Sequence, residues 1–393
     1  MATISTDVNR PYLPSDGAKI TAEIDVEPGE QDANVRRHVA LCIDTSGSMG
    51  GAKIQQARDG AAWVFGLLED DDYVSLVGFD TEATVHIPTT RWGRLERDEA
   101  MDAVEDLTAG GGTDMFGGLA SAREELASSR AGPDAVKRLL LLSDGKDNEH
   151  EPDDFAELAR EIDDSGVRIQ SAGIGEDYNE DTIRTLGTTA RGTWTHLEAP
   201  GDIEEFFGDA VEQAASVVAP DAQIELDVAP GVEVSEVYRA LPQAQEVGVE
   251  WEDNAAVVKL PDLTEREHQR VVLKIHAPAR RELEEVTLAD VTLSARGDTA
   301  SDDVTVEYTD DNDKIAEHDE SVSIDHKQTV IRTELGKGNV EAAETQVEKM
   351  TVVHGEETEA VQEADRQTQI VKEGGRAEQS QATQIVDDAD RLG

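Results

Sequence analysis

Between about residues 37 and 217, short apolar runs alternate with amphipathic stretches, and this rhythm constrains the fold more than any other feature of the chain. The run 38–44 is almost entirely apolar, as expected for a strand that is buried on both faces. The next stretch repeats apolar residues at spacings of three and four, which is typical of one helix face: Ile54, Ala57, Ala61, Val64 and Leu68. The alternation predicts an α/β domain with a doubly wound, mostly parallel sheet and helices on both faces.

The same pattern predicts the remaining elements of this domain. We expect strands at 73–79, 84–87, 138–143, 167–174 and 192–197. The strand 84–87 should lie at an edge of the sheet, because Pro88 follows it. We expect helices at 115–126, 153–164 and 202–217. Binding sites in such sheets lie at the carboxyl ends of the strands, near the point where the strand order reverses.

After Pro220 the rhythm changes to short alternating strands that are separated by Pro, Gly and Asp. They read as an antiparallel β region, most simply a small sandwich, with strands at 223–228, 231–237, 255–260, 271–275, 286–295 and 304–308. A strand at 18–27 has no obvious neighbour in the parallel sheet. We expect it to pair with the β region, so that the α/β domain would be inserted between two parts of the β domain.

Beyond Asp310 the chain is polar and helix-prone, and it predicts two to four helices in a hairpin or bundle. Two apolar stripes mark their buried faces: Val340, Ala343, Val347 and Met350, then Ala382, Ile385, Val386 and Ala389. The expected organisation is therefore N-terminal strands (1–36), the α/β domain (37–217), an antiparallel β-sandwich (218–310) and a C-terminal helical segment (311–393).

The chain is strongly acidic: 86 acidic and 35 basic residues give a net charge of −51. This charge argues against nucleic acid or an anionic membrane as a partner, because binding phosphate groups requires a cationic surface. A largely disordered, solvating chain would explain the charge. We favour a folded, salt-adapted protein of halophile type, because the carboxylates are spread along the chain and interleave with apolar runs.

The chain shows no signal-peptide pattern and no apolar stretch long enough to span a membrane, so a cytoplasmic protein without a membrane span is expected. Its one cysteine, Cys42, excludes an internal disulfide and is expected to be a buried apolar residue.

The segment 44–50, Asp-Thr-Ser-Gly-Ser-Met-Gly, carries the most chemistry and directly follows a predicted buried strand. Asp44, Ser46 and Ser48 supply three hard oxygen atoms at alternate positions of one turn. Thr113 lies in a glycine-rich loop, and Asp144 follows the strand 138–143. Since the loops of a parallel sheet emerge at one edge, these five side chains can converge on one divalent ion, which prefers six oxygen ligands.

This pattern resembles the von Willebrand factor type A domain over about residues 37–217. The metal-ion-dependent adhesion motif of that family has the form Asp-x-Ser-x-Ser, then a Thr, then an Asp, and all five positions are filled here. The resemblance implies that Ser46, Ser48 and Thr113 contact the metal, while Asp44 and Asp144 act partly through water. It also implies an open coordination position that accepts a carboxylate from a partner. Mg²⁺ is the expected ion, with Mn²⁺ or Ca²⁺ as alternatives.

The surroundings of the motif suggest further roles. We expect a ligand-binding rim made of Gly47, Met49, Gly112, Asp114 and Gly145. A phosphate-binding loop is disfavoured, because Ala52 and Ile54 stand where the pattern requires Gly and Ser or Thr. Lys53 is then expected to be an exposed residue of the first helical turn. Other charges and aromatic residues are expected to be structural: Asp147 and Glu149 as solvated rim charges, Trp63 and Trp194 in the core.

No nucleophile with a suitably placed base is recognisable, so we expect no catalytic residues and no enzyme. The leading hypothesis is an interaction module that binds an Asp or Glu of a protein partner through Mg²⁺. The alternative, suggested by relatives that act beside AAA-type ATPases, is a non-catalytic subunit of an ATPase-driven complex such as a chelatase. A metal-dependent hydrolase is the third possibility.

Overall fold

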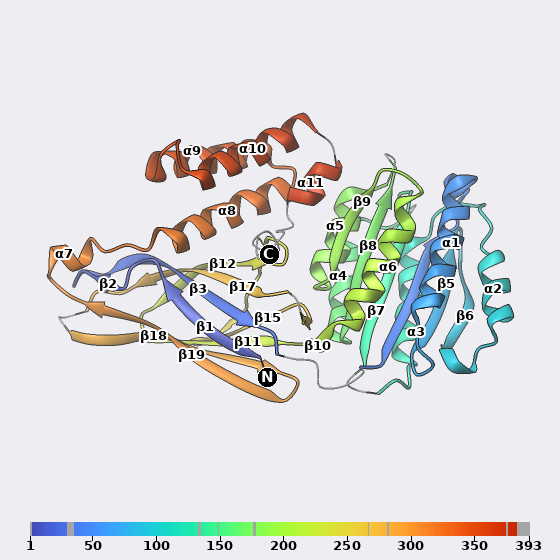
Figure 1. The fold of residues 1–393 in the computed structure, drawn as a ribbon, viewed down its shortest axis with the longest axis horizontal. Helices are drawn as coiled ribbons and strands as arrows, with labels where there is room; N and C mark the ends of the chain where they lie inside the picture. The colour runs from blue at the N-terminus through green and yellow to red at the C-terminus, as the bar shows by residue number, and fades with distance from the viewer. Residues whose placement is uncertain are drawn as a thin grey trace, which may run out of the picture. The chain divides into compact units, whose positions relative to one another are not determined.

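The structure, a computed structural model of the 393-residue chain, describes residues 2–29, 35–132, 135–147, 149–175, 178–265, 267–280, 283–374 and 376–382. It divides into two compact units. Residues 31–220 form one, called the α/β unit below, and residues 1–30 together with 221–393 form the other, the two-segment unit. Each unit is described separately (Figure 1).

The α/β unit contains a six-stranded sheet with the order β6-β5-β4-β7-β8-β9. The strands are β4 (Arg37–Asp44), β5 (Tyr73–Phe79), β6 (Ala83–Arg91), β7 (Val136–Ser143), β8 (Val167–Ile174) and β9 (Thr193–Leu197). All neighbours are parallel except β5 and β6, which are antiparallel. From the central strand β4 the chain runs outward to β5 and β6, then returns to β7 on the other side, so the strand order reverses between β4 and β7.

Helices cover both faces of this sheet, and alternate residues of β4 contribute to two separate cores. Val39, Leu41 and Ile43 pack against α1 (Ala52–Leu67), α2 (Arg97–Glu105) and α6 (Asp202–Ala215). Ala40 and Cys42 face α3 (Met115–Ala127), α4 (Pro152–Asp164) and α5 (Glu180–Thr189). Short elements complete the unit: the 3₁₀ turns η1 (Gly47–Met49) and η2 (Trp92–Arg94), and β10 (Val217–Ala219).

The structure corrects several expectations for this unit. The sequence did not predict α2 and α5, which are short and polar. Strand β6 continues through Pro88 to Arg91, which an edge strand tolerates because one of its two lateral edges has no partner strand to hydrogen-bond with in this sheet. Trp63 was expected in the core, but half of its surface is exposed, because it lies off the apolar stripe of α1. Trp194 is buried.

The two-segment unit holds two mainly antiparallel sheets (Figure 1). One has the order β1-β3-β17-β12-β13 and the other β14-β15-β11-β18-β19-β2. The N-terminal strand β3 (Ala18–Glu27) pairs along its length with β17 (Gln269–Ala277), so the two parts of the unit share one sheet. The other strands are β1 (Thr3–Val8), β2 (Tyr12–Leu13), β11 (Gln223–Val228), β12 (Glu233–Leu241), β13 (Gln245–Glu246), β14 (Trp251–Glu252), β15 (Ala255–Lys259), β16 (Leu263–Thr264), β18 (Leu283–Ala295) and β19 (Asp298–Tyr308).

The helices of this unit follow β19 in the chain: α7 (Asn312–Ile315), α8 (Glu320–Gly336), α9 (Val340–His354), α10 (Glu359–Glu373) and α11 (Arg376–Ala382). The first expected apolar stripe packs into a core between α8, α9 and α10. In the second stripe, Ile385, Val386 and Ala389 lie outside the described residues. Among the described residues, no helix combines the length and apolar character that a bilayer crossing requires.

Candidate metal centre

Three loops meet at the carboxyl edge of the α/β sheet, next to the reversal in strand order. Asp44 is the last residue of β4, and Asp144 directly follows the neighbouring strand β7. Thr113 precedes α3 at the end of the glycine-rich loop. Because β4 and β7 are adjacent and parallel, their last side chains emerge side by side.

Backbone hydrogen bonds fix the loop after β4 against the glycine-rich loop. The N–H of Gly110 donates to the carbonyl of Thr45 at 2.8 Å, and the N–H of Gly47 donates to the carbonyl of Gly111 at 3.3 Å. The N–H of Thr45 in turn donates to the carbonyl of Phe79 at the end of β5, at 2.7 Å. Gly111 has a φ of +72°, a conformation that glycine adopts without strain. The two loops therefore form one connected platform.

Hydrogen bonds link four of the five motif residues, and Thr113 lies beside them. The Ser48 hydroxyl donates to Asp144 Oδ1 at 2.6 Å, and the Ser46 and Ser48 Oγ atoms lie 3.0 Å apart. The backbone N–H of Ser46 donates to Asp44 Oδ1 at 2.8 Å. A Cβ placed on Gly145 would lie 3.2 Å from Thr113 Oγ1 and 3.7 Å from Asp44 Oδ2. The structure thus brings together all five residues that the motif singled out.

The group is deep on one side and open on the other. Asp44 and Asp144 are fully buried, and Ser46 and Thr113 are nearly so, whereas Ser48 is exposed. Burial raises the pKa of Asp44, hydrogen bonds from Ser143 and Ser46 lower it, and the nearby charge of Asp144 raises it further. Two buried carboxylates in one group repel each other, so this arrangement favours a cation. Ser48 is therefore the member of the group that lies at the surface.

Two residues that sequence reasoning missed complete the site. The Ser143 hydroxyl donates to Asp44 Oδ2 at 2.6 Å, so both oxygens of this carboxylate accept hydrogen bonds from the protein. Lys53 was expected to be exposed, but it is half-buried and its ammonium forms an ion pair with Asp144 Oδ2. Nothing in the local pattern marks Lys53, because its role depends on a contact with a carboxylate 91 positions away in the sequence.

The five expected rim residues differ in how far they are exposed to solvent. Gly47 is exposed, and Gly112 and Gly145 are partly exposed. Met49 was expected at the rim, which is wrong: it is fully buried in the core that includes α1, because the 3₁₀ turn directs it inward. The Asp114 carboxylate caps α3 by accepting the N–H of Gly117 at 2.8 Å. Its capping role accounts for its orientation.

A second group of potential ligands, Asp114, Asp147 and His150, places one atom of each residue within 4.8 Å of the others. Asp147 was expected to be a solvated rim charge, but it organises the backbone. It accepts the N–H groups of Phe116, Glu149 and His150 at 3.1, 2.9 and 2.8 Å. Burial raises the pKa of this carboxyl, but these hydrogen bonds outweigh it and lower the pKa overall. Stabilising the turn is a sufficient role for Asp147.

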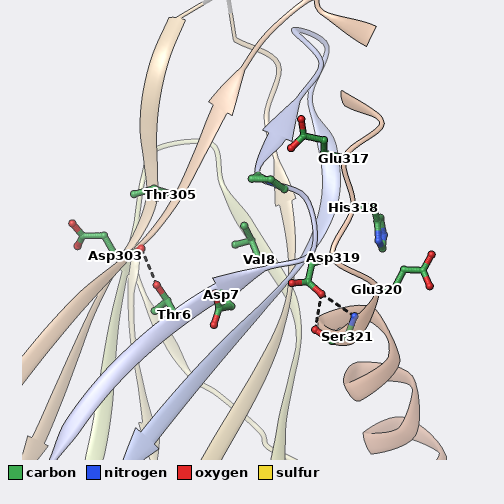
Figure 2. Close-up of a pocket in the computed structure, with 11 residues that line it drawn as sticks. Thr6, Asp7, Val8, Asp303, Thr305, Glu317, His318, Asp319, Glu320 and Ser321 are labelled. Carbon is green, nitrogen blue, oxygen red and sulfur yellow. Dashed lines mark hydrogen bonds between the residues drawn. The ribbon is translucent and has the colours of Figure 1, made fainter. Parts of the chain in front are cut away.

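A cavity of about 1040 Å³ lies in the two-segment unit, between β1, β19 and the start of α8 (Figure 2). Five of its eleven lining residues are acidic, among them Asp7, Asp303 and Asp319. Asp319 caps α8 by accepting the N–H of Ser321 at 2.9 Å, and the Thr6 hydroxyl donates to the carbonyl of Asp303 at 2.9 Å. These contacts stabilise strand and helix ends, and we assign no ligand to the cavity.

The donor set at the sheet edge fits a hard divalent cation. It consists of two carboxylates and three hydroxyls, all of which are oxygen donors of the kind that Mg²⁺, Mn²⁺ and Ca²⁺ prefer. The formal charges of Asp44, Asp144 and Lys53 add up to −1, and a divalent cation would reverse this sign.

Part of the chain matches a known protein family. The family profile of the von Willebrand factor type A domain matches residues 38–209. An uncharacterized protein of Synechocystis sp. is 24% identical over 267 residues, which cover 67% of this chain and 62% of the relative. The inter-alpha-trypsin inhibitor heavy chain H3 of mouse is 24% identical over 200 residues, or 49% of this chain and 22% of the relative. The chain thus spans less than two thirds of both relatives.

Structural similarity extends over nearly the whole chain. The structure of a von Willebrand factor type A protein from Catenulispora acidiphila has a TM-score of 0.81 and 18% sequence identity, and the match covers 98% of this chain and 97% of that one. The two-segment unit therefore has a counterpart in a solved structure. Residues 38–209 of this chain form a von Willebrand factor type A domain.

Proposed function

We propose that this domain is a metal-dependent interaction module that binds a divalent ion, with Mg²⁺ the expected one, and through it an acidic residue of a partner protein. One observation carries the proposal. Two fully buried carboxylates at the ends of adjacent strands, Asp44 and Asp144, are linked to the surface at Ser48: Asp44 accepts the backbone N–H of Ser46, whose hydroxyl meets that of Ser48, and Asp144 accepts the Ser48 hydroxyl. A protein interaction is the general role of this type of domain, and the metal and the acidic ligand are our extension of it.

Each residue has a distinct part in this proposal. Ser46, Ser48 and Thr113 would hold the ion through neutral hydroxyls, while Asp44 and Asp144 balance part of its charge. A bound divalent ion supplies the positive charge that an incoming Asp or Glu carboxylate requires. Ser143 keeps Asp44 oriented through its hydrogen bond at 2.6 Å. The exposed position of Ser48 lets a partner's carboxylate approach without unfolding either loop.

The metal part of the proposal is tested by titrating Mn²⁺ into the chelator-treated full chain and measuring free Mn²⁺ by electron paramagnetic resonance. We expect saturable binding of one ion, which the double variant Ser46→Ala/Ser48→Ala loses. The control is Ser235→Ala/Ser301→Ala, which removes two exposed hydroxyls from the two-segment unit and should bind as the wild type does. Equal binding by the wild type and the Ser46/Ser48 variant would refute the assignment.

The ligand part requires a carboxylate probe. Glutarate titrated into the Mn²⁺-loaded chain should lower the water proton relaxation rate, because a carboxylate that reaches the ion displaces water from it. Glutaramide, which has the same length but carries no charge, should have no effect. A response to glutaramide equal to that of glutarate would contradict recognition of an acidic group.

A further inference from the structure

We propose that Lys53 makes the metal centre bind its ion more weakly and a partner's carboxylate more tightly than the five motif residues would do alone. This inference rests on the proposed function and assigns a role to a residue outside the motif. Lys53 is the second residue of α1, and its ammonium forms an ion pair with Asp144 Oδ2.

The contact places a fixed positive charge inside the site. Asp144 is fully buried, and its two oxygens have different partners: Oδ1 accepts the Ser48 hydroxyl, and Oδ2 faces the ammonium of Lys53. The Lys53 side chain retains 29% of its surface, so it also borders solvent. Lys53 Nζ lies 3.7 Å from the position that a Cβ on Gly175 would occupy, and Gly175 directly follows β8. The charge is therefore in direct contact with the buried Asp144, whose other oxygen accepts the hydroxyl of the exposed Ser48.

Counting charges gives the expected direction of each effect. With Asp44, Asp144 and Lys53 charged, the site carries −1, and a divalent ion changes this to +1. One incoming carboxylate then brings the total to zero. Without Lys53 the same states carry −2, 0 and −1. Removing the ammonium should therefore favour the ion and disfavour the carboxylate, since like charges in a partly buried site repel and opposite charges attract.

The opposite signs of the two effects distinguish this role from a structural one. If Lys53 merely held Asp144 in position, its removal would misplace a ligand and weaken both the ion and the carboxylate. If Lys53 were an ordinary surface charge, neither affinity would respond. Only a positive charge that repels the ion and attracts the carboxylate changes the two affinities in opposite directions.

The test compares Lys53→Met, which keeps the aliphatic stem, and Lys53→Arg, which keeps the charge. The control is Lys146→Met, which removes the same charge from an exposed position two residues after Asp144. All variants are used as full chains, at the lowest KCl concentration at which circular dichroism reports the wild-type fold. Mn²⁺ binding is followed by electron paramagnetic resonance, and glutarate binding to the Mn²⁺-saturated proteins by water proton relaxation.

We expect Lys53→Met to lower the Kd for Mn²⁺ about tenfold, which corresponds to ~1.4 kcal/mol, and to raise the Kd for glutarate by a similar factor. For Lys53→Arg and Lys146→Met, the Kd values for Mn²⁺ and for glutarate should both stay within about threefold of the wild-type values. If Lys53→Met does not fold, Lys53→Gln takes its place with the same expectation. Parallel weakening of both ligands, or no change in either, would overturn the role of Lys53.

The same data separate this inference from the proposed function. If the wild type shows no Mn²⁺ binding that depends on Ser46 and Ser48, the metal centre itself is refuted. If the wild type binds Mn²⁺ in this way and Lys53→Met binds both ligands unchanged, the metal centre stands and only the role of Lys53 fails.

Discussion

Ser143 shows how a single hydroxyl sets the character of the site. It is fully buried, and its hydrogen bond to Asp44 lowers the pKa of a carboxyl whose burial raises it. Replacing Ser143 by Ala leaves one oxygen of a buried carboxylate without this donor, at a cost of about 1–3 kcal/mol. We therefore expect Ser143→Ala to lower the free energy of unfolding by that amount and to weaken Mn²⁺ binding, as measured by chemical denaturation and by titration.

Ser75 provides a matched control. It is also fully buried in a strand of the same sheet, but its hydroxyl meets His38 Nε2 at the longer distance of 3.4 Å. Burial lowers the pKa of His38 to about 3, so this contact involves a neutral ring. Ser75→Ala should cost less stability and leave Mn²⁺ binding intact. Equal Mn²⁺ affinities of Ser75→Ala and Ser143→Ala would contradict a role of the Ser143 hydroxyl in metal binding.

Glu23 gives a pH prediction for the two-segment unit. Arg270 contacts three carboxylates, Glu23 at 2.5 Å, Asp25 at 2.7 Å and Asp325 at 2.5 Å, and one cation cannot neutralise all of them. Burial of Glu23 raises its pKa to about 8. The folded chain thus retains a proton that the unfolded chain releases near its ordinary value of 4.5, so the contribution of Glu23 to stability falls as the pH rises from about 4.5 to 8.

Glu23→Gln should remove the loss of stability that deprotonation of Glu23 causes as the pH rises. The melting temperature of the variant, relative to the wild type, should increase from pH 5 to pH 8.5 in calorimetry at constant KCl. The control is Glu27→Gln, an exposed position on the same strand, which should follow the wild-type pH dependence. If the melting temperatures of Glu23→Gln and the wild type differ by the same amount at pH 5 and at pH 8.5, Glu23 does not titrate in this range.

At the scale of single elements, apolar periodicity predicted α1 and α3 well, because their buried residues repeat at helical spacing. It failed for α2 and α5, since α2 buries only Ala100 and Val104 and the buried residues of α5 include a threonine and a glycine. The places of Asp44 and Asp144 at the carboxyl edge of the sheet were predictable for the same reason as the strands, because both residues lie at the ends of apolar runs. Lys53 and Ser143 were not, because only the folded sheet brings them to their partners.

Two helix glycines test how closely the elements pack. A Cβ on Gly118 of α3 would lie 2.6 Å from the buried ring of Phe79, whereas a Cβ on Gly66 of α1 would meet no atom within 4 Å. Alanine is favoured over glycine in helices by up to about 1 kcal/mol. We expect Gly66→Ala to stabilise the chain by up to this amount and Gly118→Ala to destabilise it by about 1–3 kcal/mol. Chemical denaturation measures both, and a stable Gly118→Ala variant would mean that α3 can shift on the sheet.

The chain folds into two units despite its high net charge. Residues 31–220 form their own unit, and the chain before and after them shares one sheet through β3 and β17. Both units contain cores of buried apolar side chains, so the net charge of −51 belongs to a folded chain. Composition alone left this open, because a high charge also fits a disordered chain. Buried strands such as β4 and β8 resolve it, since all their residues are buried.

The charge predicts how stability depends on salt. In dilute buffer, carboxylates spread over the surface of both units repel one another, and added ions screen this repulsion. The Debye length falls from about 10 Å at 0.1 M to about 3 Å at 1 M, so most of the screening is complete by about 1 M. We expect the melting temperature to rise steeply between 0.1 and 1 M KCl and to level off above it, as followed by far-UV circular dichroism. Sucrose, which stabilises proteins without screening charge, should give no such plateau. A melting temperature that does not change between dilute buffer and 2 M KCl would show that the carboxylates do not limit the stability of this chain.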